Sequence, residues 1–318
     1  MKKELGILTL LILLCTVTAV LNPRFISAPN LLNLANSIGL FGIFSLGLGL
    51  VIITGGIDLS VGSVFALAGV LLAMALTEWN WPWPLAAAMA IAIPTALGWG
   101  NGWLITRLKI QPFVVTLCGL LLYRGLARFI ANDGTKGFGN AEGFEMLRDL
   151  SKGKLLGLPM PFVILIVITV ILWFVLHRST YGRYLFAVGR NEEATRFSGI
   201  NTRLVIASSY VVAGVLTGIA GILLAFYTNS ISPSNHGSFY ELYGIAAAVL
   251  GGCSLRGGEG SVIGIIIGTA LFQVLQNVVN LLGIPSSLNF TVMGAVVLIG
   301  VLADQIIQKR AARKQLRV

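Results

Sequence analysis

The chain has 318 residues, of which 56% are hydrophobic and only 11% are charged. A soluble domain carries about 25% charged residues, so this composition excludes an ordinary soluble protein and indicates an integral membrane protein. The formal net charge of +10 does not point to nucleic acid, because basic residues of membrane proteins gather on the cytoplasmic side. Three cysteines and two histidines, without ligand spacing, predict neither a disulfide framework nor a metal site.

Apolar runs recur along the whole chain. A membrane-spanning helix needs about 20 such residues, so the predicted fold is an all-α polytopic membrane protein, a single transmembrane domain over residues 1–318. The first run is expected to be a retained helix, because no signal-peptide cleavage site follows it. About ten spans are expected, at Leu5–Leu21, Leu31–Ile53, Leu59–Thr77, Pro84–Thr106, Phe113–Ala131, Pro161–Leu176, Leu204–Tyr227, Phe239–Leu250, Val262–Leu282 and Pro285–Ala303.

An even number of spans places both termini on one side. With both termini in the cytoplasm, most of the 22 lysine and arginine residues are cytoplasmic, as the positive-inside rule requires. Two long connections then stand out. The external one, about 132–158, is of mixed charge and is either a docking surface or a solvated cap. The cytoplasmic one, about 177–203, contains a short helix signal. Asn191 can cap it, Glu192 and Glu193 suit its first turn, and Gly199 suits its end.

The stretch "GGIDLSVGS" at 55–63 contains the only charged residue between Arg24 and Glu78, which is Asp58. Asp58 follows a glycine pair and precedes an apolar helix, so its carboxylate is predicted to cap that helix, and Ser60 could do the same. Direct contact with a substrate or an ion is the alternative. The stretch aligns with "GGCSLRGGEGSV" at 251–262, and both are predicted to form turns at cytoplasmic helix ends. The turn residues are Gly55, Gly56, Asp58, Ser60, Gly62, Gly251, Gly252 and Gly260.

A polar stripe marks the ninth expected span. Its members are three, four and seven residues apart, so they share one helix face. They are candidates to line a pore, although amides also bond between helices. The four candidates are Gln273, Gln276, Asn277 and Asn280. Three rings on nearby spans, Phe44, Phe65 and Phe272, fit either a gate or ordinary packing.

Three segments resemble the ribose-type sugar-importer permeases of the ATP-binding-cassette class. The stretch "GGIDLSVGS" looks like that family's most characteristic motif. The segment "GRNEEATRFSGIN" at 189–201 resembles its cytoplasmic coupling loop, and "GGCSLRGGEGSVIGIIIG" at 251–268 is similar to its late glycine-rich segment. The resemblance implies a multi-pass permease subunit of the bacterial inner membrane that forms the path for a ribose-, xylose- or galactose-like monosaccharide.

The resemblance also implies partners in addition to the lipid bilayer: ATPase subunits inside, a periplasmic sugar-binding protein outside, and a second permease copy as homodimer or close paralogue. Contact with the ATPase would fall on Asn191, Glu192, Glu193, Ala194, Arg196, Gly199 and Ile200. The chain contains no G-x-x-x-x-G-K-[ST] phosphate loop, so it is not predicted to be an enzyme. ATP and Mg²⁺ would lie on the partner ATPase, and no cofactor is expected in this chain.

Two other functions stay open at this point. One is a permease for branched-chain amino acids or another small polar solute. The other is an ion-coupled secondary transporter in which Asp58 carries a proton or binds an ion. A membrane-embedded enzyme acting on lipid is disfavoured, since the sequence offers no paired carboxylates and no Ser-His-Asp set.

Overall fold

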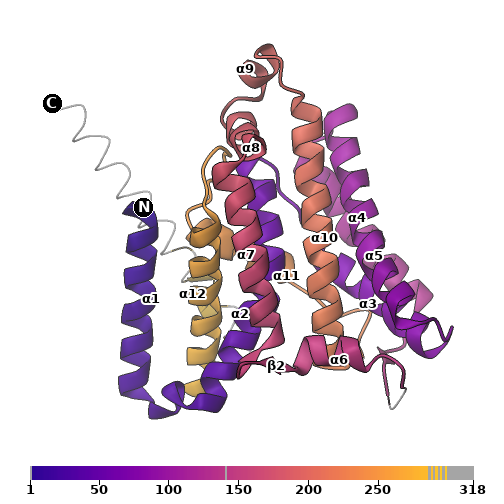
Figure 1. Cartoon of the computed structure of the whole chain (residues 1–318), viewed down its shortest axis with the longest axis vertical. Helices are drawn as coiled ribbons and strands as arrows, with labels where there is room; N and C mark the ends of the chain where they lie inside the picture. Colours follow the sequence, from indigo (N-terminus) through magenta and orange to yellow (C-terminus); the bar gives the residue numbers. More distant parts are fainter. Residues whose placement is uncertain are drawn as a thin grey trace.

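The computed structural model describes residues 2–139 and 142–285 and a few isolated positions between 288 and 298. Long helices stand side by side and form one bundle (Figure 1). In chain order the elements are α1 (Lys2–Leu21), the 3-10 helix η1 (Pro23–Ile26), α2 (Ala28–Ile53), α3 (Val61–Thr77), α4 (Trp83–Arg107), α5 (Pro112–Ile130), β1 (Lys136–Gly137), α6 (Glu145–Lys152), β2 (Lys154–Leu155), β3 (Leu158–Pro159), α7 (Met160–Arg178), α8 (Thr180–Arg190), α9 (Glu192–Phe197), α10 (Thr202–Thr228), β4 (Ser230–Ile231), α11 (Tyr240–Leu250) and α12 (Val262–Leu281).

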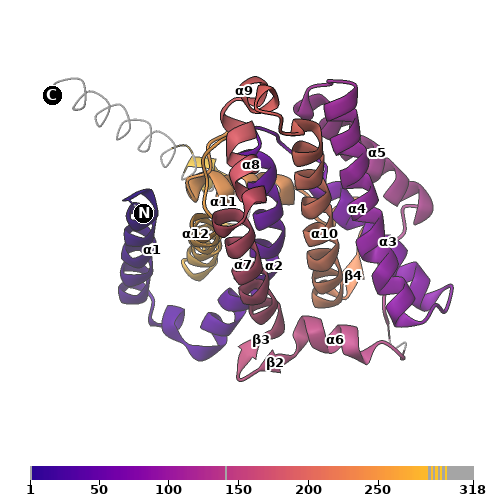
Figure 2. The ribbon, with the colours of Figure 1, turned by 45° about the horizontal axis from the view of Figure 1, so that its top comes forward.

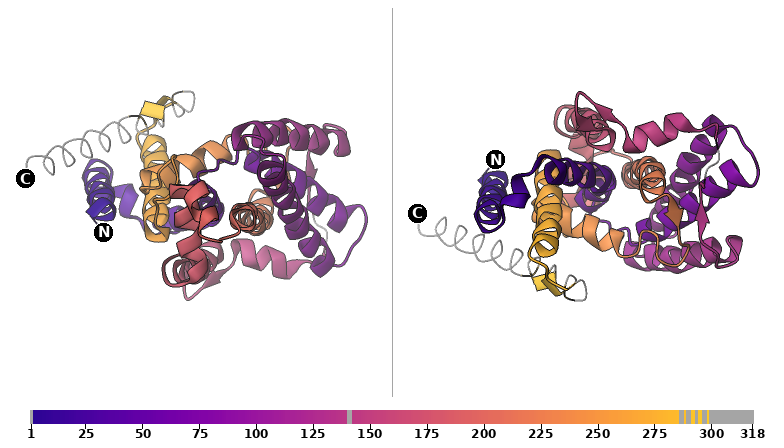
Figure 3. Two further views of the ribbon diagram at one scale, coloured as in Figure 1. Left: turned by 90° about the horizontal axis from the view of Figure 1, so that it is seen from above. Right: turned by 90° about the horizontal axis from the view of Figure 1, so that it is seen from below.

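Helix α2 lies at the centre of the bundle. Within its most apolar window 83% of the residues are buried, against 6% for α1, which stands at one edge and packs on α12. Helices α3, α4 and α5 form the opposite edge (Figure 3). The largest hydrophobic cluster joins α2 to α7, α10, α11 and α12. A buried helix that is apolar on all sides is typical of the interior of a membrane bundle.

The bundle has two distinct ends, named here after the short helices that cover them. The α9 end has α8 and α9 (Figure 2), and the N-terminal Glu4 meets Ser261 there. The α6 end has α6 and the two short antiparallel ladders, β1 with β4 and β2 with β3. Beneath this end the Phe138 ring stacks on Phe226 of α10, and the Phe144 ring lies tilted against Phe226, so these contacts fix the connection between α5 and α7 to α10.

The all-α membrane fold is confirmed. Within the described residues, seven helices are long and apolar enough to cross a membrane, namely α1, α2, α4, α5, α7, α10 and α12. Two further apolar helices, α3 and α11, are shorter and coincide with the third and eighth expected spans. The total of about ten stays a prediction, because most of the run Pro285–Ala303 and the C-terminus lie outside the described residues.

Glycines let α4 and α10 pack closely. A Cβ on Gly102 would lie 2.7 Å from the Cα of Ala207, and one on Gly218 would lie 2.8 Å from the Cα of Ile91. Small residues at four-residue spacing allow such backbone approach between membrane helices. These glycines therefore serve packing within one chain.

Candidate functional site

Two interrupted helices begin next to each other inside the bundle. Helix α3 has 17 residues and α11 has 11, which correspond to about 25 Å and about 16 Å at 1.5 Å per residue. Gly62, in the first turn of α3, packs against Gly237, in the loop before α11, and against Glu241, in the first turn of α11. Non-helical backbone at membrane depth occurs only where protein or a water-filled cavity surrounds it. This region, here called the central junction, is therefore a candidate functional site.

Asp58 lies in the extended stretch before α3 and is 5% exposed. Its Oδ1 accepts hydrogen bonds from the Ser60 N–H at 2.9 Å and from the Ser60 Oγ at 2.6 Å. Ser60 occupies the N-cap position of α3 but makes no capping bond to it. The predicted cap therefore takes a modified form. Asp58 orders the residue that begins the helix, and it does not bond to the first free amides of the helix itself.

A chain of side-chain donors leads to Asp58. Tyr123 donates to the Asn101 Oδ1 at 3.2 Å, and the Asn101 amide donates to the Ser60 Oγ at 3.3 Å. The Tyr210 hydroxyl donates to the Ile57 carbonyl at 3.2 Å. These residues come from α4, α5 and α10, so three helices satisfy the polar groups of one extended segment. A small cavity of about 10 Å³ adjoins Asp58 and Asn101.

Arg124 and Glu241 also lie at the central junction, although neither was predicted as a site residue. Glu241 is 6% exposed, and its carboxylate interacts with the Gly62 N–H. The positive charge of Arg124 is close enough to interact electrostatically with this carboxylate. Arg124 falls within the expected span Phe113–Ala131, and Glu241 falls within the expected span Phe239–Leu250, just after a polar loop. Their position within apolar spans could have identified both residues, because ionisable residues inside membrane segments are functional candidates by default.

A second junction lies at the α9 end, where both glycine-rich turns meet. The Gly258 N–H donates to the Ile53 carbonyl at 2.8 Å, which closes the end of α2. A Cβ on Gly257 would lie 2.9 Å from the Cα of Gly55. Gly189, in the last turn of α8, packs against Ile53 and Gly258, with no space for a side chain. The structure thus brings the two aligned motifs into contact and joins them to α8.

Helix α9 follows α8 and projects furthest at this end (Figure 1). The Asn191 Oδ1 accepts from the Ala194 N–H at 2.9 Å, and Glu192 accepts from the Thr202 hydroxyl at 3.1 Å. Gly199 has φ +82° just after the helix. The short helix predicted from these residues is therefore present. Phe197 at its end is 82% exposed, which leaves an aromatic side chain for a partner.

Helix α8 was not predicted, although it holds α9 in place. Its buried face carries Leu185 and Val188. The Tyr181 hydroxyl lies 2.7 Å from the Ser208 Oγ on α10. Burial raises the pKa of Tyr181, so this hydroxyl stays protonated at neutral pH. The α8–α9 unit is thus fixed to both α7 and α10.

The four residues of the polar stripe on α12 lie in different environments. Asn277 and Asn30 of α2 form a reciprocal amide pair at 2.8 Å and 3.1 Å. Gln273 is buried with its Nε2 unpaired, while Gln276 is half-buried and Asn280 is exposed. Asn277 therefore bonds between helices, and pore lining by the stripe stays a prediction.

The three rings that fit either a gate or ordinary packing belong to one aromatic cluster. Phe44 and Phe65 lie 5.2 Å apart between ring centroids, and Tyr240 of α11 contacts both. Phe272 joins through Tyr243 at 5.0 Å. Phe44, Phe65 and Phe272 are almost fully buried, which is the environment of packing residues in this chain. Within the described residues, no group of three His, Cys, Asp or Glu side chains is placed to hold a metal ion.

Comparison with known proteins decides the family. Residues 30–302 match the model of the branched-chain amino acid transport system permease component. The chain belongs to this permease family. It is 39% identical over 305 residues to the ribose import permease protein RbsC of Bacillus subtilis (strain 168), covering 95% of this chain and 93% of that protein. No solved structure matches it.

Two other similar proteins carry different sugar names. The galactofuranose transporter permease protein YtfT of Escherichia coli (strain K12) is 34% identical over 276 residues, covering 86% of this chain and 79% of that protein. The fructose import permease protein FrcC of Rhizobium meliloti is 30% identical over 311 residues, covering 96% and 86%. Like them, this chain is a multi-pass membrane permease.

Proposed function

We propose that this chain is the membrane subunit of an ATP-driven bacterial importer for a monosaccharide, with a ribose-like pentose as the first candidate. The observation that carries the proposal is similarity along nearly the whole chain to a permease named for ribose import. Relatives named for galactofuranose and fructose broaden the class to small sugars. The α9 end then faces the cytoplasm and the α6 end faces outward, which agrees with the distribution of basic residues.

The α8–α9 unit is the proposed contact with the ATPase. It is held to the bundle by α8 and exposes Phe197. Its base touches the junction of Gly55, Gly189 and Gly257, so a push on α9 reaches the segment that leads to α3. ATP and Mg²⁺ belong to that partner, and this chain supplies only the docking surface.

The α6 end is the proposed docking side for a sugar-binding protein. Helix α6 packs its apolar side, including Leu147, on the bundle, and its charged residues alternate in sign around the rest. A second permease copy, identical or a close paralogue, completes the path. If sugar passes along a surface shared by the two copies, the partly exposed Tyr240 and Tyr243 of α11 are candidates to contact it.

Uptake measurements test the substrate class. Cells that lack their own ribose permease are supplied with this chain, its ATPase and its binding protein, and labelled ribose uptake is measured. We expect saturable uptake that unlabelled ribose suppresses and leucine does not. Leucine uptake instead would favour the amino-acid function that the family's description also covers.

A further inference from the structure

The loop between α10 and α11 descends from the α6 end to the central junction. It spans residues 229–239, with the ladder residue Ile231 paired to Lys136 at its beginning. Ile231 is fully buried and His236 is 8% exposed. The loop is therefore anchored at depth and not merely laid on the surface, and its tip around Ser234 is exposed.

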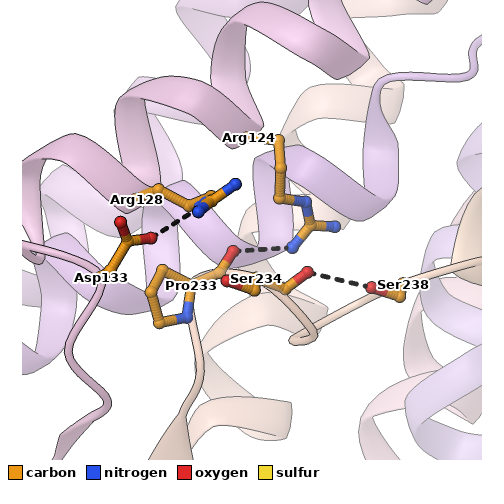
Figure 4. Close-up of polar contacts among 6 residues, drawn as sticks. All are labelled: Arg124, Arg128, Asp133, Pro233, Ser234 and Ser238. Atoms are coloured by element: carbon orange, nitrogen blue, oxygen red, sulfur yellow. Dashed lines mark hydrogen bonds and ion pairs between the residues drawn. The ribbon is translucent and has the colours of Figure 1, made fainter.

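Arg124 of α5 holds this loop and α3 at the same time. One terminal nitrogen, Nη1, donates to the carbonyls of Pro233 at 3.1 Å and His236 at 2.7 Å. The other, Nη2, donates to the carbonyl of Gly62 at 3.0 Å. Figure 4 shows the guanidinium group reaching the loop at Pro233. A planar guanidinium presents several donors in a fixed fork, which suits a bridge between separate carbonyls.

Gly62 is held from its other side as well. Its N–H interacts with the Glu241 carboxylate. A side chain at this position would collide with Glu241 and with the carbonyl of Gly237. The first turn of α3 is thus fixed between Arg124 and the first turn of α11, and it cannot shift without changing one of these contacts.

From Gly62 the chain runs back to the α9 end through a short, well-bonded segment. Asp58 and Ser60 are hydrogen-bonded to each other, and the Ile57 carbonyl is held by Tyr210. Gly55 then packs on Gly257, beside the base of α8. Because this short segment is held at both ends and at the Ile57 carbonyl, we expect displacement at one end to be passed to the other.

We propose that Arg124 is a positioning residue that passes displacement of the loop between α10 and α11, residues 229–239, to the start of α3 and from there to the α8–α9 unit. The proposal rests on the proposed function, in which a binding protein docks at the α6 end and an ATPase at the α9 end. Arg124 touches backbone of both segments, so moving the loop moves Gly62. The alternative is a static role, in which Arg124 only stabilises the fold.

Arg128, one helical turn further along α5, offers a matched control. It pairs with Asp133 at 2.6 Å on the surface, where both side chains are more than half exposed. Figure 4 shows this pair beside Arg124. Arg128→Gln removes the same charge from the same helix and leaves the loop-to-α3 bridge intact.

The experiment measures ATPase activity of the full complex in lipid nanodiscs, with and without sugar-loaded binding protein. For Arg124→Gln we expect a lower thermal midpoint, because part-buried carbonyls lose their donor, and a ratio of stimulated to basal ATPase activity at least fivefold smaller than that of the unmodified complex. Arg124→Lys, which keeps one donor group, is expected to give intermediate stimulation, and Arg128→Gln should match the unmodified complex.

Retained stimulation in Arg124→Gln would overturn the proposal. So would equal fractional losses of basal and stimulated activity, which leave their ratio unchanged, since that pattern shows a static role. If the glutamine variant does not assemble, Arg124→Lys decides in the same way: an unchanged stimulation ratio contradicts the proposal. An unmodified complex that lacks ATPase binding or stimulation would instead count against the proposed function.

Discussion

The segment between α2 and α3 is held at its two ends by different kinds of contact. At the α9 end, backbone meets backbone, because Gly55, Gly189 and Gly257 leave no side chains in the way. At the central junction, hydrogen-bonding side chains such as Asp58 and Arg124 surround the backbone. The first junction therefore requires residues without a side chain, whereas the second requires particular hydrogen-bond donors and acceptors. Added side chains at Gly55, Gly189 or Gly257 should break the first junction, and loss of a hydrogen-bonding side chain such as Asp58 or Arg124 should break the second.

The largest effect is expected for Gly189→Ala. The added methyl group would meet backbone atoms of Ile53 and Gly258, and such overpacking costs about 1–3 kcal/mol. We expect a lower thermal midpoint of the purified protein and a loss of ATPase association. Gly100 on α4 has open space around its Cβ position, and Gly100→Ala should be neutral or stabilising. Equal effects of the two substitutions would contradict the claim that tight backbone packing at Gly189 holds the junction at the α9 end.

Substitutions of Asp58 test whether hydrogen bonds hold the central junction. Asp58→Asn keeps an oxygen acceptor for the Ser60 N–H, so we expect near-normal sugar uptake. Asp58→Ala leaves buried donors unpaired at a cost of about 1–3 kcal/mol, and uptake and protein level should both fall. If Asp58→Asn abolishes uptake while expression and assembly are intact, the charge itself takes part in transport.

A charge reversal on α9 tests whether the α9 end is the docking surface for the ATPase. In the double variant Glu192→Lys with Glu193→Lys, we expect severalfold weaker co-purification of the ATPase and uncoupled transport. The same charge change at Glu142 and Glu145, at the α6 end, is the control and should leave ATPase co-purification unchanged. Unaltered assembly and uptake in the α9 variant would remove the coupling assignment.

The smallest effect is expected at the Asn30–Asn277 amide pair, far from both junctions. A double-mutant cycle with alanine at the two positions should give a coupling free energy of about 0.6–2 kcal/mol, the range for hydrogen bonds between membrane helices. Thermal unfolding in detergent measures it. A reduction in sugar uptake larger than the loss of stability would show that Asn277 also faces the pathway.

Local signals predicted much of the fold. Apolar runs located the described spans, and the Asn191 cap, the acidic first turn and Gly199 located α9 within a residue or two. Helix α8 was missed because its pattern is amphipathic and not uniformly apolar, so a search for spans passes over it.

The central junction could not be predicted, because it depends on contacts between residues far apart in the chain. The Arg124 bridge to Gly62 and His236 crosses 62 and 112 positions. The "GGIDLSVGS" motif was recognised, but the need for glycine at position 62 is visible only when Glu241 and Gly237 are placed against it. Pore lining has the same difficulty, since Asn277 shows its partner only in three dimensions.

The energy source for uptake tests the central claim most directly. Proteoliposomes containing this chain with its ATPase, and the sugar-loaded binding protein added outside, are supplied internally with ATP or with a non-hydrolysable analogue. We predict ribose accumulation with ATP only, unaffected by a proton ionophore. Accumulation that persists without the ATPase and collapses with the proton gradient would contradict the importer assignment and would return Asp58 to consideration as an ion-coupling carboxylate.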